Sequence, residues 1–139
     1  MSDPTYRLRP VGRVESPLTD RAAAPKQGDE GAPLARVVFL PEYREAAGDL
    51  HEGDEVLVLT WLHLGRRDVV LSVHPRGDAT RPRDGVFSTR SPDRPNPIGL
   101  HAATIETVEE DAIAVRNLEA IDGTPVLDVK PVLGGPNQR

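Results

Sequence analysis

The sequence contains no cysteine, which excludes disulfide bonds, thiolate metal ligands and thiol nucleophiles. Aromatic residues make up only 4% of the 139 residues, so the core must consist mainly of aliphatic side chains. No apolar run approaches the length of a membrane span, and residues 1–10 lack the apolar stretch of a signal peptide. These absences predict a soluble, cytoplasmic protein with one domain, residues 1–139, and no membrane segment.

Long helical segments are also missing. Fourteen prolines and twelve glycines interrupt the chain every few residues, which favours short strands joined by loops. The one short helix is expected at residues 41–48, where Pro41 suits a helix N-terminus and Gly48 suits its end. The expected strands span residues 8–15, 34–40, 55–64, 68–73, 101–108, 112–118 and 124–132. This spacing predicts an all-β fold, an antiparallel barrel or sandwich with short helical insertions.

An excess of positive charge is missing, because 22 acidic residues outnumber 17 basic residues and the formal net charge is −5. Binding to nucleic acid usually needs basic residues that replace the counterions of the phosphates. Residues 74–94 carry five arginines against three aspartates, a local net charge of +2 that leaves −7 on the rest of the chain. The candidates for phosphate contact are Arg76, Arg81, Arg83 and Arg94. The asymmetry is modest and leaves a small-molecule substrate open as the alternative to RNA.

The most informative stretch is residues 85–100, GVFSTRSPDRPNPIGL. Its three prolines fix φ and deny N–H donors, so residues 91–99 can form neither a helix nor a central strand. Gly99 can take a positive φ that other residues resist. Arg90 and Arg94 would be held as fixed cations in this stiff loop. Its spacing fits a binding loop and a rigid exposed connection equally well.

Other candidate residues give weaker signals on their own. Asp122 and Gly123 form a turn signature, and Asp122 can accept hydrogen bonds from a ligand, although simple turn closure is the favoured interpretation. Asp128 and Lys130 share one strand face, where an ion pair is favoured. His63 ends the most apolar run and has the pattern of a structural histidine. The four histidines lack close ligand spacing, so we expect no metal site.

The order of these segments resembles the TsaA/TrmO family. Residues 11–17 (VGRVESP) match a family strand, residues 25–27 (PKQ) match its P-R-Q loop, and a buried strand then ends in His63. The two longest matches are residues 85–100 and residues 122–131 (DGTPVLDVKP). The resemblance runs from about residue 11 to residue 132, and the last two motifs are rare in combination.

The resemblance implies a compact β-barrel that binds S-adenosyl-L-methionine without a G-x-G-x-x-G phosphate loop, and a homodimer with its cofactor sites near the subunit boundary. The implied reaction is methyl transfer to the exocyclic nitrogen of threonylcarbamoyl-adenosine in tRNA. By position, the cofactor contacts would be Pro25, Lys26, Gln27, His63, Arg90, Leu100, Asp122, Gly123 and Thr124. Of these, His63 and Asp122 are the candidates for a catalytic base.

Three departures from the family pattern bear on the substrate. Lys26 stands where arginine is usual, Leu64 where a polar residue commonly follows the histidine, and Val132 where tyrosine is usual. The extra C-terminal domain of longer bacterial members is not expected here. Two alternatives to tRNA methylation therefore remain: an enzyme that uses the cofactor on a small molecule, and a regulator that binds the cofactor without catalysis.

Overall fold

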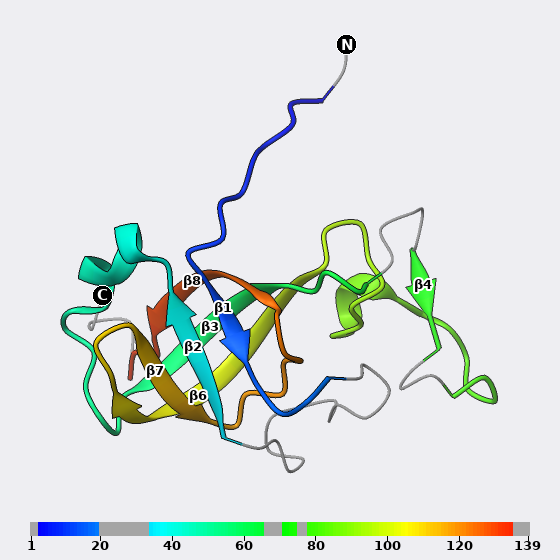
Figure 1. Ribbon diagram of the computed structural model, residues 1–139. Helices are drawn as coiled ribbons and strands as arrows, with labels where there is room; N and C mark the ends of the chain where they lie inside the picture. The colour runs from blue at the N-terminus through cyan, green and yellow to red at the C-terminus, as the bar shows by residue number, and fades with distance from the viewer. Residues whose placement is uncertain (1–2, 20–33, 66–70, 75–77, 135–139) are drawn as a thin grey trace.

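Six antiparallel strands close into a barrel, with neighbours in the order β1-β2-β7-β6-β3-β8 (Figure 1). The computed structural model describes residues 3–19, 34–65, 71–74 and 78–134. The barrel strands are β1 (Gly12–Glu15), β2 (Ala35–Phe39), β3 (Glu55–Trp61), β6 (Ile98–Val108), β7 (Ala112–Arg116) and β8 (Pro125–Pro131). Two further strands, β4 (Ser72–Val73) and β5 (Asp84–Gly85), pair outside the barrel. The predicted all-β fold is confirmed, as a barrel rather than a sandwich.

The interior follows from alternation along the strands. In β3, and in β6 as far as Ile105, every second residue is buried, as expected when successive side chains point to opposite faces of a sheet. The buried cluster consists mostly of valine and isoleucine, with Phe39 as its only aromatic member among the described residues. Such compact side chains suit a barrel of six strands, because barrel diameter falls with strand number and leaves a narrow interior.

The helical segments are short 3-10 turns. Element η3 (Pro41–Ala47) occupies the expected helix position, and η5 (Val86–Ser88) is a single turn. None of the η3 side chains is buried, so its packing adds little to the core. Within the described ranges, no helix is long and apolar enough to cross a membrane.

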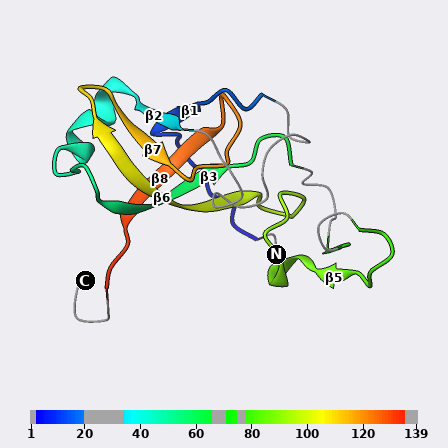
Figure 2. The ribbon, with the colours of Figure 1, turned by 90° about the horizontal axis from the view of Figure 1, so that it is seen from below.

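Residues 62–97, which we call the insert, leave the barrel after β3 and return to it at β6. The insert contains β4, β5 and η5, and Figure 2 shows it lying beside one end of the barrel. The barrel itself is continuous across this excursion, because β3 and β6 pair directly from Glu55↔Thr104 to Trp61↔Ile98. The insert is therefore an addition to one end of a closed sheet.

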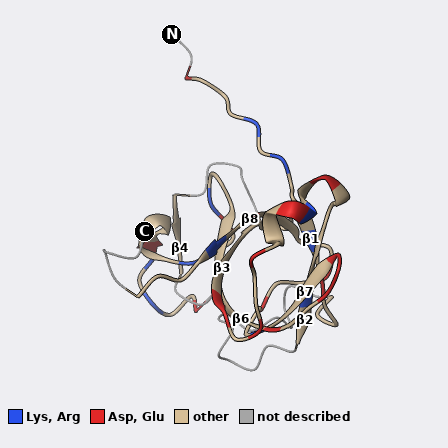
Figure 3. Cartoon of the chain, turned by 90° about the vertical axis from the view of Figure 1, so that its left-hand side faces the viewer, with Lys and Arg blue, Asp and Glu red and all other residues tan. Residues whose placement is uncertain are grey.

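The barrel has two chemically different ends. At the insert end lie the ends of β1 and β3 and the starts of β2, β6 and β8. At the opposite end, which we call the acidic end, lie residues 40–54 and 109–111, which carry eight acidic residues and one basic residue. Figure 3 looks toward the acidic end and shows acidic residues on η3 and on neighbouring loops.

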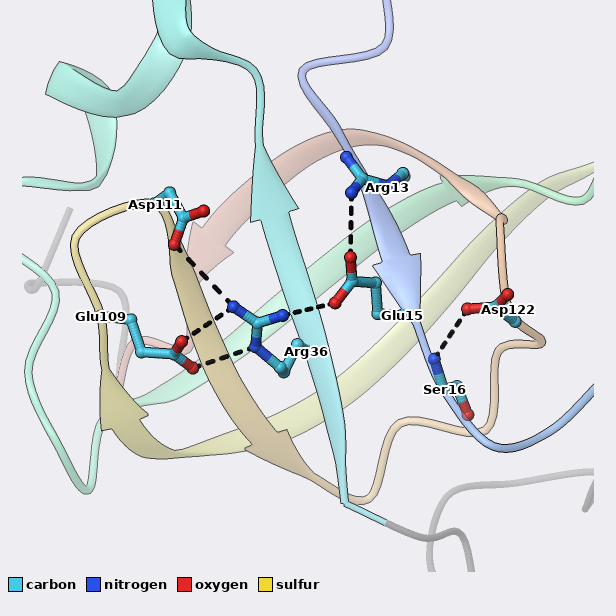
Figure 4. Close-up of polar contacts among 7 residues, drawn as sticks. All are labelled: Arg13, Glu15, Ser16, Arg36, Glu109, Asp111 and Asp122. Carbon is cyan, nitrogen blue, oxygen red and sulfur yellow. Dashed lines mark hydrogen bonds and ion pairs between the residues drawn. The ribbon is translucent and has the colours of Figure 1, made fainter.

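A charged cluster connects β1, β2 and the turn between β6 and β7 on the outside of the barrel (Figure 4). Arg36 on β2 pairs with Glu15 on β1, with Glu109 at 2.8 Å and with Asp111 at 3.8 Å. The hydrogen bond to Glu109 raises the pKa of Arg36 above its ordinary value, with further contributions from the charges of Glu109 and Glu15. The cluster is more than one third exposed, so we assign it a modest share of the stability.

Several predicted boundaries were wrong by a few residues. The strand predicted at 8–15 begins only at Gly12, and Pro10 before it has no N–H to donate to a neighbouring strand. The strand predicted at 101–108 begins at Ile98, so the last two residues of segment 91–99 do join a central strand. They can do so because residues 98 and 99 are not prolines and pair with β3. The strand predicted at 68–73 includes β4, while residues 68–70 lie outside the described ranges.

Candidate functional site

The structure brings several of the predicted cofactor residues to the insert end. The end of β3 lies beside the starts of both β6 and β8, through the pairs Trp61↔Ile98 and Thr60↔Val126. His63 follows β3, Leu100 lies near the start of β6, and residues 122–124 lead directly into β8. Segments that are far apart in sequence therefore meet at one end of the barrel.

Four predicted site residues lie outside the described ranges: Pro25, Lys26, Gln27 and Arg76. The connection that contains residues 25–27 leaves the barrel after β1 and re-enters it at β2. Glu15, at the end of β1, pairs with Arg36 at the start of β2. Both ends of this connection therefore lie at the insert end.

The predicted turn at Asp122 is confirmed. A carboxylate oxygen of Asp122 accepts a hydrogen bond from the Ser16 backbone N–H at 3.0 Å (Figure 4). The Asp122 N–H donates to the Leu18 carbonyl at 2.6 Å, and Gly123 has a φ of 83°. Thr124 is buried, and its hydroxyl donates to the Ile121 carbonyl at 2.7 Å. Asp122 thus closes the turn and anchors the end of β1, while its side chain stays exposed.

The turn that carries His63 is held against the proline-rich loop of the insert. The Leu62 N–H donates to the Pro97 carbonyl at 2.7 Å. A Cβ placed on Gly65 would lie 2.2 Å from the Pro92 carbonyl oxygen, so the two backbones approach closely. The His63 side chain itself is exposed. It is therefore available to a ligand at the insert end.

Arg90 and Arg94, the two arginines of the proline-rich loop, have different roles. One guanidinium nitrogen of Arg94 donates to the carbonyls of Thr89 and Ser91 at 2.9 and 3.0 Å, so Arg94 stiffens the loop from within. Arg90 is exposed and donates to the Leu100 carbonyl at 3.2 Å, which ties it to β6. Hydrogen bonds from Arg94 therefore connect the loop internally, and Arg90 presents a cation at the insert end.

Gly99 has a different role from the one its sequence context suggests. The positive-φ glycines of the described residues are Gly53 and Gly123, so Gly99 does not use this freedom. A Cβ on Gly99 would instead lie 2.4 Å from Thr60 Oγ1 and 2.7 Å from His101 Nε2. Glycine is required here because two polar side chains pack directly against its Cα.

The arginines predicted to contact phosphate are not equivalent. Arg83 donates to the hydroxyl and carbonyl oxygens of Ser72 at 3.0 and 2.7 Å, which clamps β4 to β5. The side chain of Arg81 is exposed and makes no hydrogen bond or ion pair within the described part of the chain. Hydrogen bonds from Thr80 hold the pKa of the neighbouring Asp78 below its usual range. Arg81 is therefore the described insert arginine most available to a phosphate.

Sequence patterns alone did not identify a buried polar group at this end. Thr60 and His101 are buried, and Glu119 contacts His101. One signal was present in the sequence: His101 occupies an inward-facing position of β6, where a polar residue needs a partner. Its partner Glu119 is eighteen residues away in the β7–β8 connection, and no local pattern joins the two.

The favoured interpretation of Asp128 and Lys130 agrees with the structure, since their side chains form an exposed ion pair at 3.4 Å. Within the described residues, no group of three or more potential ligands could hold a metal ion.

Comparisons with known proteins agree with this geometry. The family model of the tRNA-methyltransferase O N-terminal domain matches residues 13–135. A protein of Methanothermobacter thermautotrophicus named "Probable S-adenosyl-L-methionine-binding protein" is 46% identical over 132 residues, which are 94% of this chain and 93% of that protein. An "S-adenosyl-L-methionine-binding protein" of Archaeoglobus fulgidus is 41% identical over 123 residues, 88% of this chain and 86% of that protein.

Among solved structures, TrmO from Pseudomonas aeruginosa superposes with a TM-score of 0.74 at 27% identity. The match covers 97% of this chain and 61% of that one, so this chain spans less than two thirds of the longer enzyme. The family model covers most of the chain, and the barrel and the order of the motifs agree with it. The chain therefore belongs to the TrmO family, as a match to its tRNA-methyltransferase O N-terminal domain.

Proposed function

We propose that this protein binds S-adenosyl-L-methionine at the insert end and transfers its methyl group to the exocyclic nitrogen of threonylcarbamoyl-adenosine in tRNA. The observation that carries the proposal is the meeting of His63, Leu100 and residues 122–124 at one end of the barrel. Relatives that cover nearly the same length are named for binding this cofactor. The proposed substrate places the protein in the cytoplasm.

The reaction is an in-line displacement at the methyl carbon. When bound, S-adenosyl-L-methionine would supply the methyl group and keep the electrons of the broken C–S bond on its sulfur, and a base on this chain would take the proton of the acceptor nitrogen as the N–C bond forms. Holding nucleophile, methyl carbon and sulfur in line supplies much of the rate. His63 and Asp122 are the two candidates for the base. We favour His63, because the Asp122 carboxylate already accepts the Ser16 N–H.

The charge distribution supports an RNA partner at the same end. The insert carries seven arginines and four aspartates, a net charge of +3. Most of the excess acid that makes the chain −5 overall lies on the loops of the acidic end. A tRNA that approaches the insert end would therefore meet the more basic part of the protein.

We also propose a homodimer in which a second copy covers the outer face of β3 and β6. Three register pairs place apolar side chains on this face: Leu57↔Ala102, Leu59↔Leu100 and Trp61↔Ile98. Ile98 and Leu100 are 43% and 42% exposed, although both are apolar. Leu100 is also a predicted cofactor contact, so this face is continuous with the cofactor site. Sedimentation should show a dimer that Ala102→Glu converts to a monomer, and a monomeric wild type would refute the dimer.

Two measurements test the proposed function. Calorimetry at millimolar S-adenosyl-L-methionine should show heat, and the cofactor should raise the melting temperature by mass action. Mass spectrometry of tRNA nucleosides from a deletion strain should show loss of the methylated nucleoside. Absence of heat and of a thermal shift would refute the cofactor.

A small-molecule methyltransferase is the second candidate, favoured by the net charge of −5. It predicts cofactor binding with unchanged tRNA nucleosides in the deletion strain. A regulator without catalysis predicts cofactor binding without turnover on any substrate. The nucleoside measurement therefore separates the tRNA proposal from both alternatives.

A further inference from the structure

Three polar side chains form a hydrogen-bonded chain inside the barrel near its insert end. Thr60 Oγ1 lies 2.7 Å from His101 Nε2, and His101 Nδ1 contacts a carboxylate oxygen of Glu119. Thr60 is fully buried, and the side chains of His101 and Glu119 are 5% and 15% exposed. An ionised carboxylate only accepts, so Nδ1 donates to Glu119, and Nε2 of a neutral ring accepts the Thr60 hydroxyl.

Thr60, His101 and Glu119 belong to three different segments, and each segment also carries a predicted cofactor residue. The neighbours are His63 three residues after Thr60, Leu100 directly before His101, and Asp122 three residues after Glu119. Backbone pairing already joins β3 to β6, but the Glu119 segment is an irregular connection outside the ladder. The His101–Glu119 contact therefore links this connection to the barrel wall just before the Asp122 turn.

These hydrogen bonds join a hydroxyl, an imidazole and a carboxylate in that order, which also occurs in nucleophilic triads. Thr60 has no exposed surface, so its hydroxyl cannot reach a substrate. Gly99 packs over the Thr60–His101 contact and leaves no room for a Cβ, which seals the hydroxyl further. The geometry therefore excludes a nucleophilic role and leaves a role in positioning.

We propose that Thr60, His101 and Glu119 form an internal brace that fixes the three cofactor-bearing segments relative to one another. This inference rests on the proposed cofactor function of the insert end. The brace members are positioning residues: they hold His63, Leu100 and Asp122 in register without touching the cofactor. Loss of the brace should leave a folded barrel whose cofactor contacts no longer converge.

The test compares variants that keep or remove each hydrogen bond at nearly constant shape. Thr60→Ser and Glu119→Gln retain an oxygen for His101, whereas Thr60→Val and Glu119→Leu do not. Calorimetry with S-adenosyl-L-methionine, at a temperature where circular dichroism shows each variant folded, gives the dissociation constant. We expect Thr60→Val and Glu119→Leu to weaken binding by about tenfold or more, and the two conservative variants to stay within about threefold of wild type.

The outcomes separate this inference from the proposed function. Wild type that binds no cofactor would overturn the proposed function, and the brace with it. Wild type that binds, with equal affinity in all folded variants, would overturn the brace alone, even if the disruptive variants melt at lower temperature. Should Thr60→Val fail to fold, the pair at Glu119 decides, because that side chain is partly exposed and its loss opens no sealed cavity.

Discussion

The Asp122 carboxylate accepts a hydrogen bond from the Ser16 backbone N–H at 3.0 Å, across 106 residues of sequence. This contact gives Asp122 a structural role at the end of β1 in addition to any role in binding. Asp122→Ala should lower the free energy of unfolding by about 0.5–1.5 kcal/mol, the net contribution of one hydrogen bond, because water can replace the lost acceptor at this exposed site. Asp122→Asn keeps an oxygen there and should lose much less stability.

Urea unfolding and cofactor calorimetry on both variants separate the two roles. If the charge of Asp122 contacts the cofactor, Asp122→Asn should weaken binding although it preserves most of the stability. Equal cofactor affinity in Asp122→Asn and wild type would show that the charge of Asp122 is not used in binding.

Arg90 should contribute to cofactor affinity. It is exposed at the insert end and oriented by the Leu100 carbonyl. Arg90→Ala should weaken S-adenosyl-L-methionine binding by about 10- to 150-fold, the range for loss of a charged hydrogen bond of about 1.5–3 kcal/mol. Arg44→Ala in η3 removes the same charge at the acidic end and should leave the calorimetric dissociation constant unchanged. An equal effect of both variants would argue against a local contact at Arg90.

Gly99→Ala should destabilise the barrel by about 1–3 kcal/mol, the usual cost of overpacking a tight site. The added Cβ would lie 2.4 Å from Thr60 Oγ1, far below contact distance. Gly85→Ala is the matched control, because the atom nearest to its added Cβ, the Leu71 carbonyl oxygen, would be 4.0 Å away. Denaturant unfolding of both variants measures the difference. Equal stability of the two variants would contradict the close packing at Gly99.

Arg81 should contact the phosphates of tRNA. Arg81→Ala should lower tRNA affinity and reduce the slope of log affinity against log salt by about 0.7–0.9, the value for one phosphate contact. Arg83 is a poorer test because its loss would also release the clamp on Ser72. Filter binding across a salt series measures both effects, with Arg44→Ala as the control at the acidic end. Wild-type binding that does not depend on salt would refute the tRNA partner.

The pKa of Asp78 should depend on Thr80. Hydrogen bonds from the Thr80 hydroxyl and N–H lower the pKa of Asp78. A lowered carboxyl pKa adds stability at pH values above the ordinary range, and this contribution disappears as the pH falls through the lowered value. Thr80→Val should raise the pKa, measured by NMR titration of the Asp78 side chain. An unchanged titration would show that the Thr80 hydroxyl does not hold the carboxylate.

Local patterns were sufficient for much of the fold. The most apolar run of the sequence identified β3, and Asp122 with Gly123 identified the turn before β8. The start of β6 was missed because three prolines dominate segment 91–99, while its last two residues pair with β3. Pairing between distant strands decided this boundary, and no local window contains that information.

In the candidate site too, local sequence patterns identified single residues, and the folded structure decided which of them meet. The motif residues His63, Leu100 and Asp122 were identified one by one, but their meeting at one end follows from the closed strand order. Glu119, the partner of His101, lies in an irregular connection. Neither the periodicity of apolar residues nor the spacing of charged residues in the sequence therefore points to it. Arg94 was expected to face phosphate, yet the backbone carbonyls it contacts depend on the folded path of its own loop.

The start of β1 and the end of β8 both lie at the acidic end of the barrel. The Val11 carbonyl accepts a hydrogen bond from Leu40, next to η3, and the Val132 N–H donates to the Glu55 carbonyl after β8. A module appended after β8 would therefore begin at the end of the barrel opposite the proposed cofactor site. It could reach the cofactor site of its own subunit only across the length of the barrel, so the length of its linker would determine whether it acts there or on the site of a second subunit.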